Sequence, residues 1–174
     1  MSRTIPLTPS GDQHTAPPIF ERIAIVGLGL IGGSIALAIR ERWPAARVIG
    51  VDRPAVIAHV QGSGAIDRAA PSLADVGDAD LIVLAAPIRQ NLELLGQIVR
   101  AARPGTVVTD VGGTKRAIVE AGRALGRSFV GGHPIGGAER GGFAFARPDL
   151  FDGRPWIFTP AAAAEHTEDS TTGS

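Results

Sequence analysis

Short apolar runs alternate with amphipathic stretches along most of the chain. The apolar runs predict strands over residues 23–26, 47–51, 81–86, 106–109, 128–130 and 155–159. Helical spacing of apolar positions predicts helices over residues 31–42, 54–61, 87–100 and 114–125. The run at 81–86 is apolar at every position, which is typical of a strand covered on both faces of a parallel sheet. This alternation predicts an α/β fold with a doubly wound, mostly parallel sheet.

The first predicted strand leads directly into three glycines with G-x-G-x-x-G spacing. In this motif the first glycine permits a tight turn, the second lets backbone approach a pyrophosphate, and the third lets the next helix pack closely on the strand. The free N–H groups at the start of that helix then face the phosphates. We therefore predict a single Rossmann-like dinucleotide-binding domain, in which the cofactor contacts Gly27, Leu28, Gly29, Leu30, Ile31 and Gly32.

An acidic residue, Asp52, follows the second predicted strand. Its distance from the glycine turn is close to the one at which this fold places the acid that binds the ribose hydroxyls. A carboxylate there favours NAD as the cofactor, because it would repel the additional phosphate of NADP. Arg53 leaves NADP open, since a guanidinium group can hold that phosphate. The alternative role for Asp52 is to cap the helix that begins at Pro54.

Ligands of doubly wound sheets bind at the carboxyl ends of the strands, and this rule gathers further residues at the predicted site. We expect four more of them at the cofactor: Ala86, Pro87, Asp110 and Gly112. His133 lies just after the strand at 128–130, so we expect it over the same crevice. Oxidation of an alcohol by a nicotinamide requires a group that accepts the hydroxyl proton, and a neutral imidazole suits this role. A structural histidine that caps the next helix is the alternative.

Composition narrows the function classes. The 17 basic and 17 acidic residues balance, so the charge favours neither a nucleic-acid partner nor a membrane surface. There are no cysteines, and the four histidines lack metal-ligand spacing, so we predict no metal site. No signal peptide is visible in residues 1–20, and a cytoplasmic location is the default expectation.

Residues 23–39 carry no charge, and a membrane helix is the alternative for them. The run is at the lower length limit for a span, contains several glycines and is followed by alternating strands and helices, so we favour a soluble sheet.

Residues 1–20 are rich in proline and polar residues without periodicity and are predicted to form a disordered or loosely packed tail. Residues 21–160 form the domain, and 161–174 form a polar, low-complexity tail. Three acids in the connection before residue 81 are expected in solvated loop: Asp75, Asp78 and Asp80.

Three segments resemble the prephenate/arogenate dehydrogenase family of tyrosine biosynthesis. They cover residues 27–34, 109–115 and 132–142, the last followed by Leu150-Phe151 and by residues 158–160. The third segment is the most specific, because His133, Glu139 and the glycines fall at the family's spacing. The resemblance extends over about residues 21–160. It implies NAD(P)-dependent oxidative decarboxylation of prephenate or arogenate.

The resemblance also implies roles for individual residues. His133 would accept the hydroxyl proton while a hydride moves to the cofactor and carbon dioxide leaves, giving 4-hydroxyphenylpyruvate from prephenate or tyrosine from arogenate. Glu139 would lie near the substrate mouth, with surface charge at a helix start as the alternative. Lys115, the single lysine of the chain, occupies the family's lysine position. It would orient substrate or cofactor there, with a helix-surface position as the alternative.

Two features depart from the family pattern. A serine is common at the position of Gly113, where its hydroxyl is expected to hydrogen-bond the catalytic histidine or the substrate, and Thr114 is the nearest substitute. The family normally continues after residues 158–160 into a helical domain that forms the dimer and contacts the substrate carboxylates. We therefore expect NAD binding with weak or no turnover by this chain, and no family dimer. A cofactor-binding module without turnover is the second hypothesis. A different dinucleotide-dependent reductase is the third, and the segment at 132–142 disfavours it.

Overall fold

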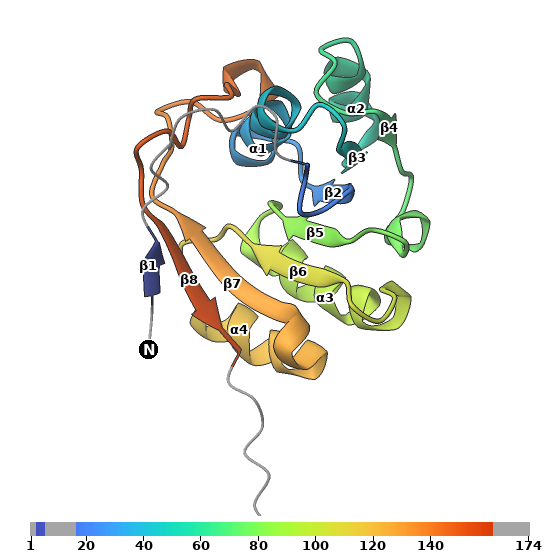
Figure 1. Ribbon diagram of the computed structural model, residues 1–174, viewed down its shortest axis with the longest axis vertical. Coiled ribbons are helices and arrows are strands. Elements are labelled where there is room, and N and C mark those ends of the chain that lie inside the picture. The colour runs from blue at the N-terminus through green and yellow to red at the C-terminus, as the bar shows by residue number, and fades with distance from the viewer. Residues whose placement is uncertain (1–2, 6–16, 162–174) are drawn as a thin grey trace, which may run out of the picture.

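The computed structural model describes residues 3–5 and 17–161, which form a sheet of eight strands with helices on both faces (Figure 1). The strands lie in the order β1-β8-β7-β6-β5-β2-β3-β4. Their bounds are β1 Arg3–Ile5, β2 Arg22–Val26, β3 Arg47–Val51, β4 Arg68–Ala69, β5 Leu81–Leu84, β6 Val107–Asp110, β7 Phe129–Pro134 and β8 Trp156–Pro160. The helices are α1 Leu30–Arg42, α2 Pro54–Gln61, α3 Ile88–Ala101 and α4 Arg116–Gly122. The strands from β4 to β7 pair in parallel, and β8 is antiparallel to both β7 and β1. The predicted doubly wound, mostly parallel Rossmann-like sheet is confirmed.

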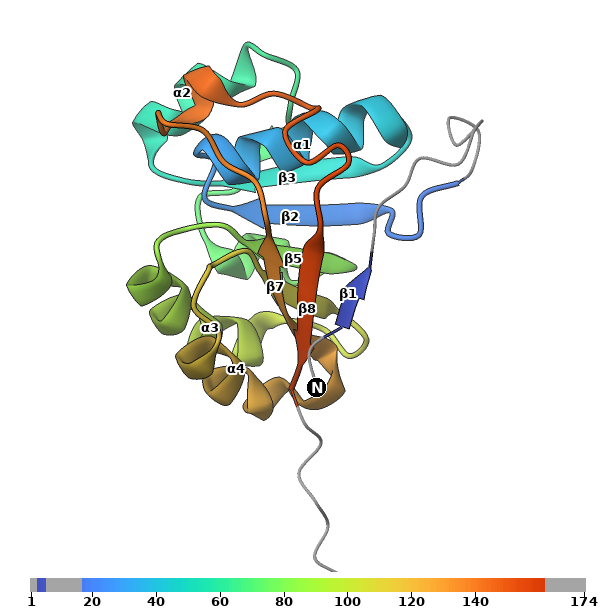
Figure 2. The same cartoon turned by 90° about the vertical axis from the view of Figure 1, so that its left-hand side faces the viewer.

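The helices divide the core into two layers. Helices α1 and α2 cover one face of the sheet, and α3 and α4 cover the other (Figures 1 and 2). Ile25, Leu28 and Ile35 are buried in the first layer, whereas Ile98 and Phe129 are buried in the second. Each such side chain contributes about 1.5–3 kcal/mol when it is fully removed from water. Because side chains alternate along a strand, His133 shares a face with Phe129, the face of α3 and α4.

Two element boundaries near His133 differ from the prediction. Helix α4 ends at Gly122 and is followed by a 3₁₀ helix at Arg123–Ser128. Strand β7 continues to Pro134, so His133 lies within the strand, opposite Ile157 of β8. The glycines before His133 weaken the local strand pattern, and it is the antiparallel pairing with β8 that extends the strand.

The N-terminal segment also differs from the prediction. Arg3–Ile5 form β1, which pairs with β8 so that Arg3 lies opposite Phe158. The prediction of a disordered or loosely packed tail is therefore wrong for these three residues, since backbone pairing at a sheet edge requires no hydrophobic periodicity. Residues 1–2 and 6–16 lie outside the described residues. So does the predicted C-terminal tail, apart from the buried Ala161.

The membrane-helix alternative for residues 23–39 is wrong, because these residues divide between β2, the glycine turn and α1. Over the described ranges, no helix has the length and apolarity to cross a membrane. The same ranges contain no cluster of three ligating side chains that could hold a metal ion.

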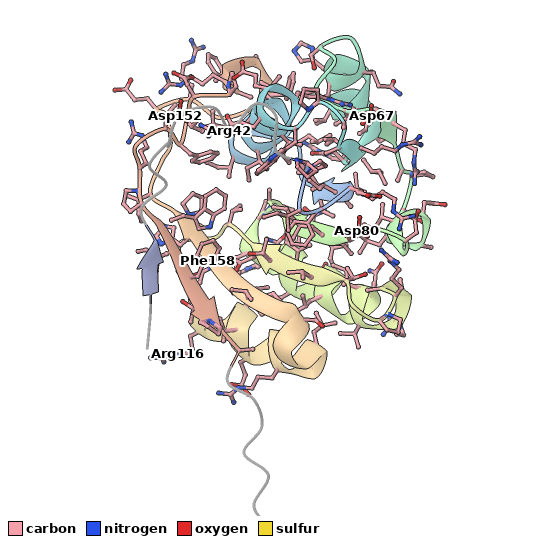
Figure 3. The ribbon with its side chains drawn as sticks, viewed as in Figure 1. Arg42, Asp67, Asp80, Arg116, Asp152 and Phe158 are labelled. Atoms are coloured by element: carbon pink, nitrogen blue, oxygen red, sulfur yellow. The ribbon has the colours of Figure 1, made fainter. Side chains whose placement is uncertain are left out.

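Asp80 connects three strands at the amino edge of the sheet. Its carboxylate accepts hydrogen bonds from the backbone N–H groups of Glu21 (3.1 Å) and Arg22 (2.8 Å) and pairs with the guanidinium groups of Arg22 and Arg103. Figure 3 shows Asp80 at this edge, and only 22% of its side chain is exposed. The expectation of a solvated loop residue is wrong for Asp80, because its carboxylate is largely buried and paired. The sequence pattern did not indicate this, since the partners of Asp80 lie far away in sequence.

We expect Asp80→Asn to destabilise the fold by about 1–3 kcal/mol at pH 7, since it weakens several charge-assisted hydrogen bonds. Burial raises the pKa of Asp80, but the Arg22 N–H and the charges of Arg22 and Arg103 outweigh it and hold this pKa below its usual 3.8. The carboxylate therefore stabilises the fold above pH 3.8, and this contribution is lost as the pH falls through the lowered pKa. Urea unfolding of both proteins at pH 7 and in acid measures the difference.

Asp149→Asn, which removes an exposed ion pair with Arg147, is the control and should change stability by less than about 0.5 kcal/mol. An equal effect of the two variants at pH 7 would refute the role of Asp80.

Candidate cofactor and catalytic site

The glycine turn is tight at two positions and open at the third. Gly27 has a φ of +93°, and a Cβ there would lie 2.5 Å from the Ala86 backbone nitrogen. A Cβ on Gly32 would lie 1.9 Å from the Gly27 carbonyl oxygen. By contrast, a Cβ on Gly29, the residue that precedes α1, would meet no heavy atom within 4 Å. The space over the first turn of α1 is therefore open to a ligand, beside N–H groups that attract an anion.

Asp52 is fixed beside this turn. One carboxylate oxygen accepts a hydrogen bond from the Leu28 N–H (2.6 Å), and the other accepts one from the Arg53 N–H (2.6 Å). Asp52 does not cap α2, since Arg53 holds that position and α2 has no side-chain cap, so this alternative is wrong. The Asp52 side chain is 15% exposed and that of Arg53 is 85% exposed. The carboxylate is thus held in place at the edge of the crevice, while the guanidinium reaches into solvent.

The segment after β5 packs directly on the glycine turn. The Ala85 N–H donates to the Val26 carbonyl (2.7 Å), and Ala86 lies against Gly27, as the close Cβ contact shows. Pro87 precedes α3 and starts it. Ala86 and Pro87 therefore lie at the same edge as Gly27, where the sequence predicts them.

The Asp110 side chain is engaged by partners within the protein. Its side chain is completely buried and accepts hydrogen bonds from the N–H groups of Gly112 (2.9 Å) and Gly132 (3.2 Å) and from the Lys115 ammonium. These bonds engage the carboxylate within the protein, while Asp110 itself ends β6 at the carboxyl edge of the sheet, so a contact between Asp110 and the cofactor stays a prediction. Gly112 itself stays at the carboxyl edge, in the loop that follows β6.

Lys115 is not on the helix surface, so that alternative is wrong. Its side chain is 17% exposed, pairs with Asp110 and donates to the Gly132 carbonyl (2.6 Å). Burial lowers the pKa of Lys115, and the neighbouring Asp110 carboxylate offsets part of that change. Its two protein partners also leave little of the ammonium free to orient a substrate.

His133 is half-buried near the end of β7 and faces the loop after β6. A Cβ on Gly113 would lie 3.4 Å from the Nε2 atom of His133. The helix-capping alternative for His133 is wrong, because the residue lies inside a strand. Strands β6 and β5 separate β7 from β2, which puts the two strand ends roughly 14 Å apart at ordinary strand spacing. The imidazole and the glycine turn thus occupy the same edge of the sheet.

Thr114 and Glu139 are both exposed. Thr114 adjoins Gly113 in the loop after β6. Glu139 lies in the irregular segment after β7 and not at a helix start, since the next helical turn begins at Phe143. The structure therefore places Thr114 beside the His133 loop and leaves Glu139 on the surface of the connection between β7 and β8.

That connection, residues 135–155, is a feature that the sequence reasoning missed. It runs over α1 and α2 before it returns as β8 (Figure 2). A Cβ on Gly33 would lie 2.6 Å from the Phe143 ring, and the Arg147 N–H donates to the Ser34 hydroxyl (3.0 Å). Arg42 and Asp152, whose labels adjoin in Figure 3, form an ion pair (2.9 Å). The Gly33-Ser34 pair was the available signal: a glycine and a small polar residue in an otherwise apolar helix indicate close approach of another segment.

Comparisons with known proteins identify the family. A family model described as "Prephenate dehydrogenase, nucleotide-binding domain" matches residues 35–169. The chain belongs to the prephenate dehydrogenase family. The predicted resemblance is thereby confirmed.

Individual relatives agree with this assignment. Prephenate dehydrogenase of Lactococcus lactis is 39% identical over 144 residues, which cover 80% of this chain and 41% of that protein. The structure of prephenate dehydrogenase from A. aeolicus in complex with hydroxyphenyl propionate and NAD+ is 32% identical, with a TM-score of 0.74 over 80% of this chain and 50% of that one. Synechocystis arogenate dehydrogenase is 34% identical, with a TM-score of 0.75 and the same coverage. The chain thus spans half or less of the length of these relatives.

Proposed function

We propose that this chain is the nucleotide-binding part of an NAD-dependent dehydrogenase that oxidatively decarboxylates prephenate or arogenate. The observation that carries the proposal is the position of His133, whose ring faces the loop after β6 at the same sheet edge as the glycine turn. Family membership adds the reaction class. The proposed partner is therefore a small-molecule substrate, and a cytoplasmic location fits a biosynthetic enzyme.

The residues at the glycine turn fit a dinucleotide. The open space over Gly29 accepts a pyrophosphate, which the N–H groups of the first turn of α1 would bind. Asp52, held by the N–H groups of Leu28 and Arg53, would accept hydrogen bonds from the ribose hydroxyls. NADP is the less favoured cofactor, because its additional phosphate would meet this carboxylate. A bound nicotinamide supplies the hydride acceptor.

His133 would take the proton of the substrate hydroxyl at Nε2. The hydride would leave the ring carbon that carries this hydroxyl, and the carboxylate on the opposite ring carbon would depart as carbon dioxide. The electrons of the broken carbon–carbon bond would make the ring aromatic as a phenolate, which then takes a proton back to give the phenol. Positioned proton transfer of this kind typically contributes 10²–10⁴-fold to the rate. Thr114 and Glu139 remain substrate-side candidates, since both are exposed and Thr114 adjoins Gly113, which faces His133. Lys115 would contribute only indirectly.

The second candidate is a cofactor-binding module without turnover of its own. One observation favours it: Gly113 offers no hydroxyl beside His133. In either case we do not expect the family's dimer from these residues.

Calorimetry with NAD and NADP, followed by assays of prephenate and arogenate with each nucleotide, tests the proposal. We expect NAD to bind more tightly than NADP, and we expect weak or no turnover by this chain alone. Absence of binding to either nucleotide would refute both candidates. Rapid turnover by the isolated chain would refute the module and the expectation of an incomplete substrate site.

Asp52→Asn should shift the nucleotide preference toward NADP. The substitution keeps acceptor geometry beside the Leu28 N–H but removes the negative charge, so the additional phosphate is no longer repelled and Arg53 is free to pair with it. We expect the ratio of the two dissociation constants to change by about tenfold or more, equivalent to about 1.4 kcal/mol. Calorimetry measures both constants. Asp78→Asn, at the opposite edge of the sheet, should leave the ratio unchanged, and an unchanged ratio in Asp52→Asn would show that Asp52 does not face the ribose.

A further inference from the structure

Strand β7 extends further than its neighbour β6. The parallel pairs between them end at Thr109 and Val130, and β6 itself ends at Asp110. On its other side, β7 pairs with β8 as far as Pro134. The backbone groups of Gly132 that face β6 therefore lie beyond the regular ladder, although buried backbone groups require partners.

Two side chains supply these partners. The Gly132 N–H donates to one Asp110 carboxylate oxygen (3.2 Å), and the Lys115 ammonium donates to the Gly132 carbonyl (2.6 Å). The other Asp110 oxygen pairs with Lys115 and also accepts the Gly112 N–H (2.9 Å). The ion pair thus takes the place of one rung of the ladder between β6 and β7.

Gly132 has no room for a side chain within this arrangement. A Cβ there would lie 2.5 Å from the Asp110 carbonyl oxygen, 2.9 Å from the Trp156 ring nitrogen and 3.0 Å from the Thr109 hydroxyl. The next residue is His133, and its Nε2 atom faces Gly113, the neighbour of Gly112. The Asp110–Lys115 ion pair therefore bonds both to Gly132, which precedes His133, and to Gly112, which precedes Gly113.

We propose that Asp110 and Lys115 are positioning residues that set the place of the His133 imidazole at the sheet edge, without touching cofactor or substrate. The role in catalysis rests on the proposed function, whereas the placement of the ring can be measured without turnover. Removal of one partner from a buried ion pair leaves an uncompensated charge, so the effect on the local backbone should be large.

Lys115→Met in the full chain tests the proposal by nuclear magnetic resonance. In the unmodified chain, the His133 ring protons should show cross-peaks to the Gly113 α-protons. We expect these cross-peaks to be lost in the variant, whereas NAD affinity changes by less than about twofold because the glycine turn is remote. Arg40→Met, which removes the ion pair with Asp67 on the other half of the sheet, is the matched control and should keep the cross-peaks.

Retained His133–Gly113 cross-peaks in Lys115→Met would overturn the proposal. So would loss of the cross-peaks together with a large loss of NAD affinity, since Lys115 would then act at the cofactor. If Lys115→Met does not fold, Asp110→Asn combined with Lys115→Met removes both charges and still leaves the Gly132 carbonyl without its donor, so the cross-peaks should again be lost. Their retention in the double variant would overturn the proposal equally.

A measurement on the unmodified chain gives an independent outcome. The Gly132 amide hydrogen should exchange with solvent at least about 100-fold more slowly than the exposed Gly113 amide, as expected for a group bonded in a stable part of the structure. Equal exchange rates would show that the Asp110–Lys115 pair does not hold the Gly132 backbone, and would overturn the proposal. Failure of NAD to bind the unmodified chain would instead refute the proposed function, and it would leave the cross-peak and exchange results interpretable.

Discussion

Gly27→Ala is expected to weaken NAD binding strongly and to destabilise the chain. Alanine at a φ of +93° is strained, and its Cβ would lie 2.5 Å from the Ala86 nitrogen and 2.6 Å from the Ala85 carbonyl carbon. Both contacts are with backbone, so neither can be relieved by a side-chain rotation. The left-handed conformation and the overpacking together cost about 2–5 kcal/mol. Because small domains have only about 5–15 kcal/mol of stability, urea unfolding should detect the loss readily.

The effect on NAD should exceed the effect expected from stability alone, because the same turn shapes the phosphate site. We expect the dissociation constant to rise about 100-fold or more, equivalent to at least about 2.8 kcal/mol. Calorimetry in conditions where the variant is still folded measures this change. NAD affinity within a few-fold of the parent would show that the nucleotide does not lie on the glycine turn.

Two other glycines provide matched controls. Gly29→Ala adds a methyl group in open space, so the free energy of unfolding should change by less than about 0.5 kcal/mol, while NAD affinity falls because the methyl group occupies the path of the pyrophosphate. Gly96→Ala, in the middle of α3 with open space around it, should stabilise the chain by about 0.5–1 kcal/mol and leave NAD affinity unchanged. A parent-like affinity in Gly29→Ala would place the phosphates elsewhere.

Elements with strong local signals were predictable from the sequence. The bounds of β3 and α2 match the prediction residue for residue, because an apolar run sets the first and Pro54, at the first helical position, sets the second. By contrast, β1 and β4 are two or three residues long and are defined by pairing with distant strands. The same applies to Asp80, whose partners Arg22 and Arg103 are separated from it by long stretches of chain.

In the candidate site, too, residues with a local sequence signal were predictable, whereas contacts with distant partners were not. The ring of His133 and the three glycines were predictable, because each carries a local pattern that has a known consequence at the edge of a parallel sheet. The direction of the Asp110 and Lys115 side chains was not, since it depends on where β6 ends relative to β7. A sequence motif can place two residues in one loop, but it does not tell whether their charges face a ligand or each other.

At Gly113, the family resemblance and the structure have to be considered together. The resemblance identifies it as the position of a common serine, and the structure gives the reason why such a serine would matter, since its Cβ would lie 3.4 Å from the His133 Nε2 atom. Gly113 also lacks the positive φ that would exclude other residues. The backbone therefore accommodates a serine there, and the sequence simply does not supply one.

His133→Asn is expected to remove turnover and to leave NAD affinity unchanged. Asparagine is similar in length and still forms hydrogen bonds, but it cannot accept the hydroxyl proton, so the rate of turnover should fall by about 10²–10⁴-fold. The NAD dissociation constant should stay within about twofold of the parent, because β6 and β5 separate His133 from the glycine turn. Turnover is measured with prephenate and NAD on this chain joined to the C-terminal part of the Lactococcus lactis relative, since we expect little or none from the chain alone.

Gly113→Ser in the same fusion is the informative partner of His133→Asn. The added hydroxyl would lie beside the His133 Nε2 atom and help to hold the ring and the substrate hydroxyl in line, so we expect turnover to rise while NAD affinity stays the same. The gain requires an imidazole to act on, and the double variant should therefore be as slow as His133→Asn alone. If Gly113→Ser increased turnover equally in the presence and absence of His133, the imidazole would not be the proton acceptor. If His133→Asn reduced turnover and NAD affinity in parallel, the histidine would serve the fold and not the chemistry.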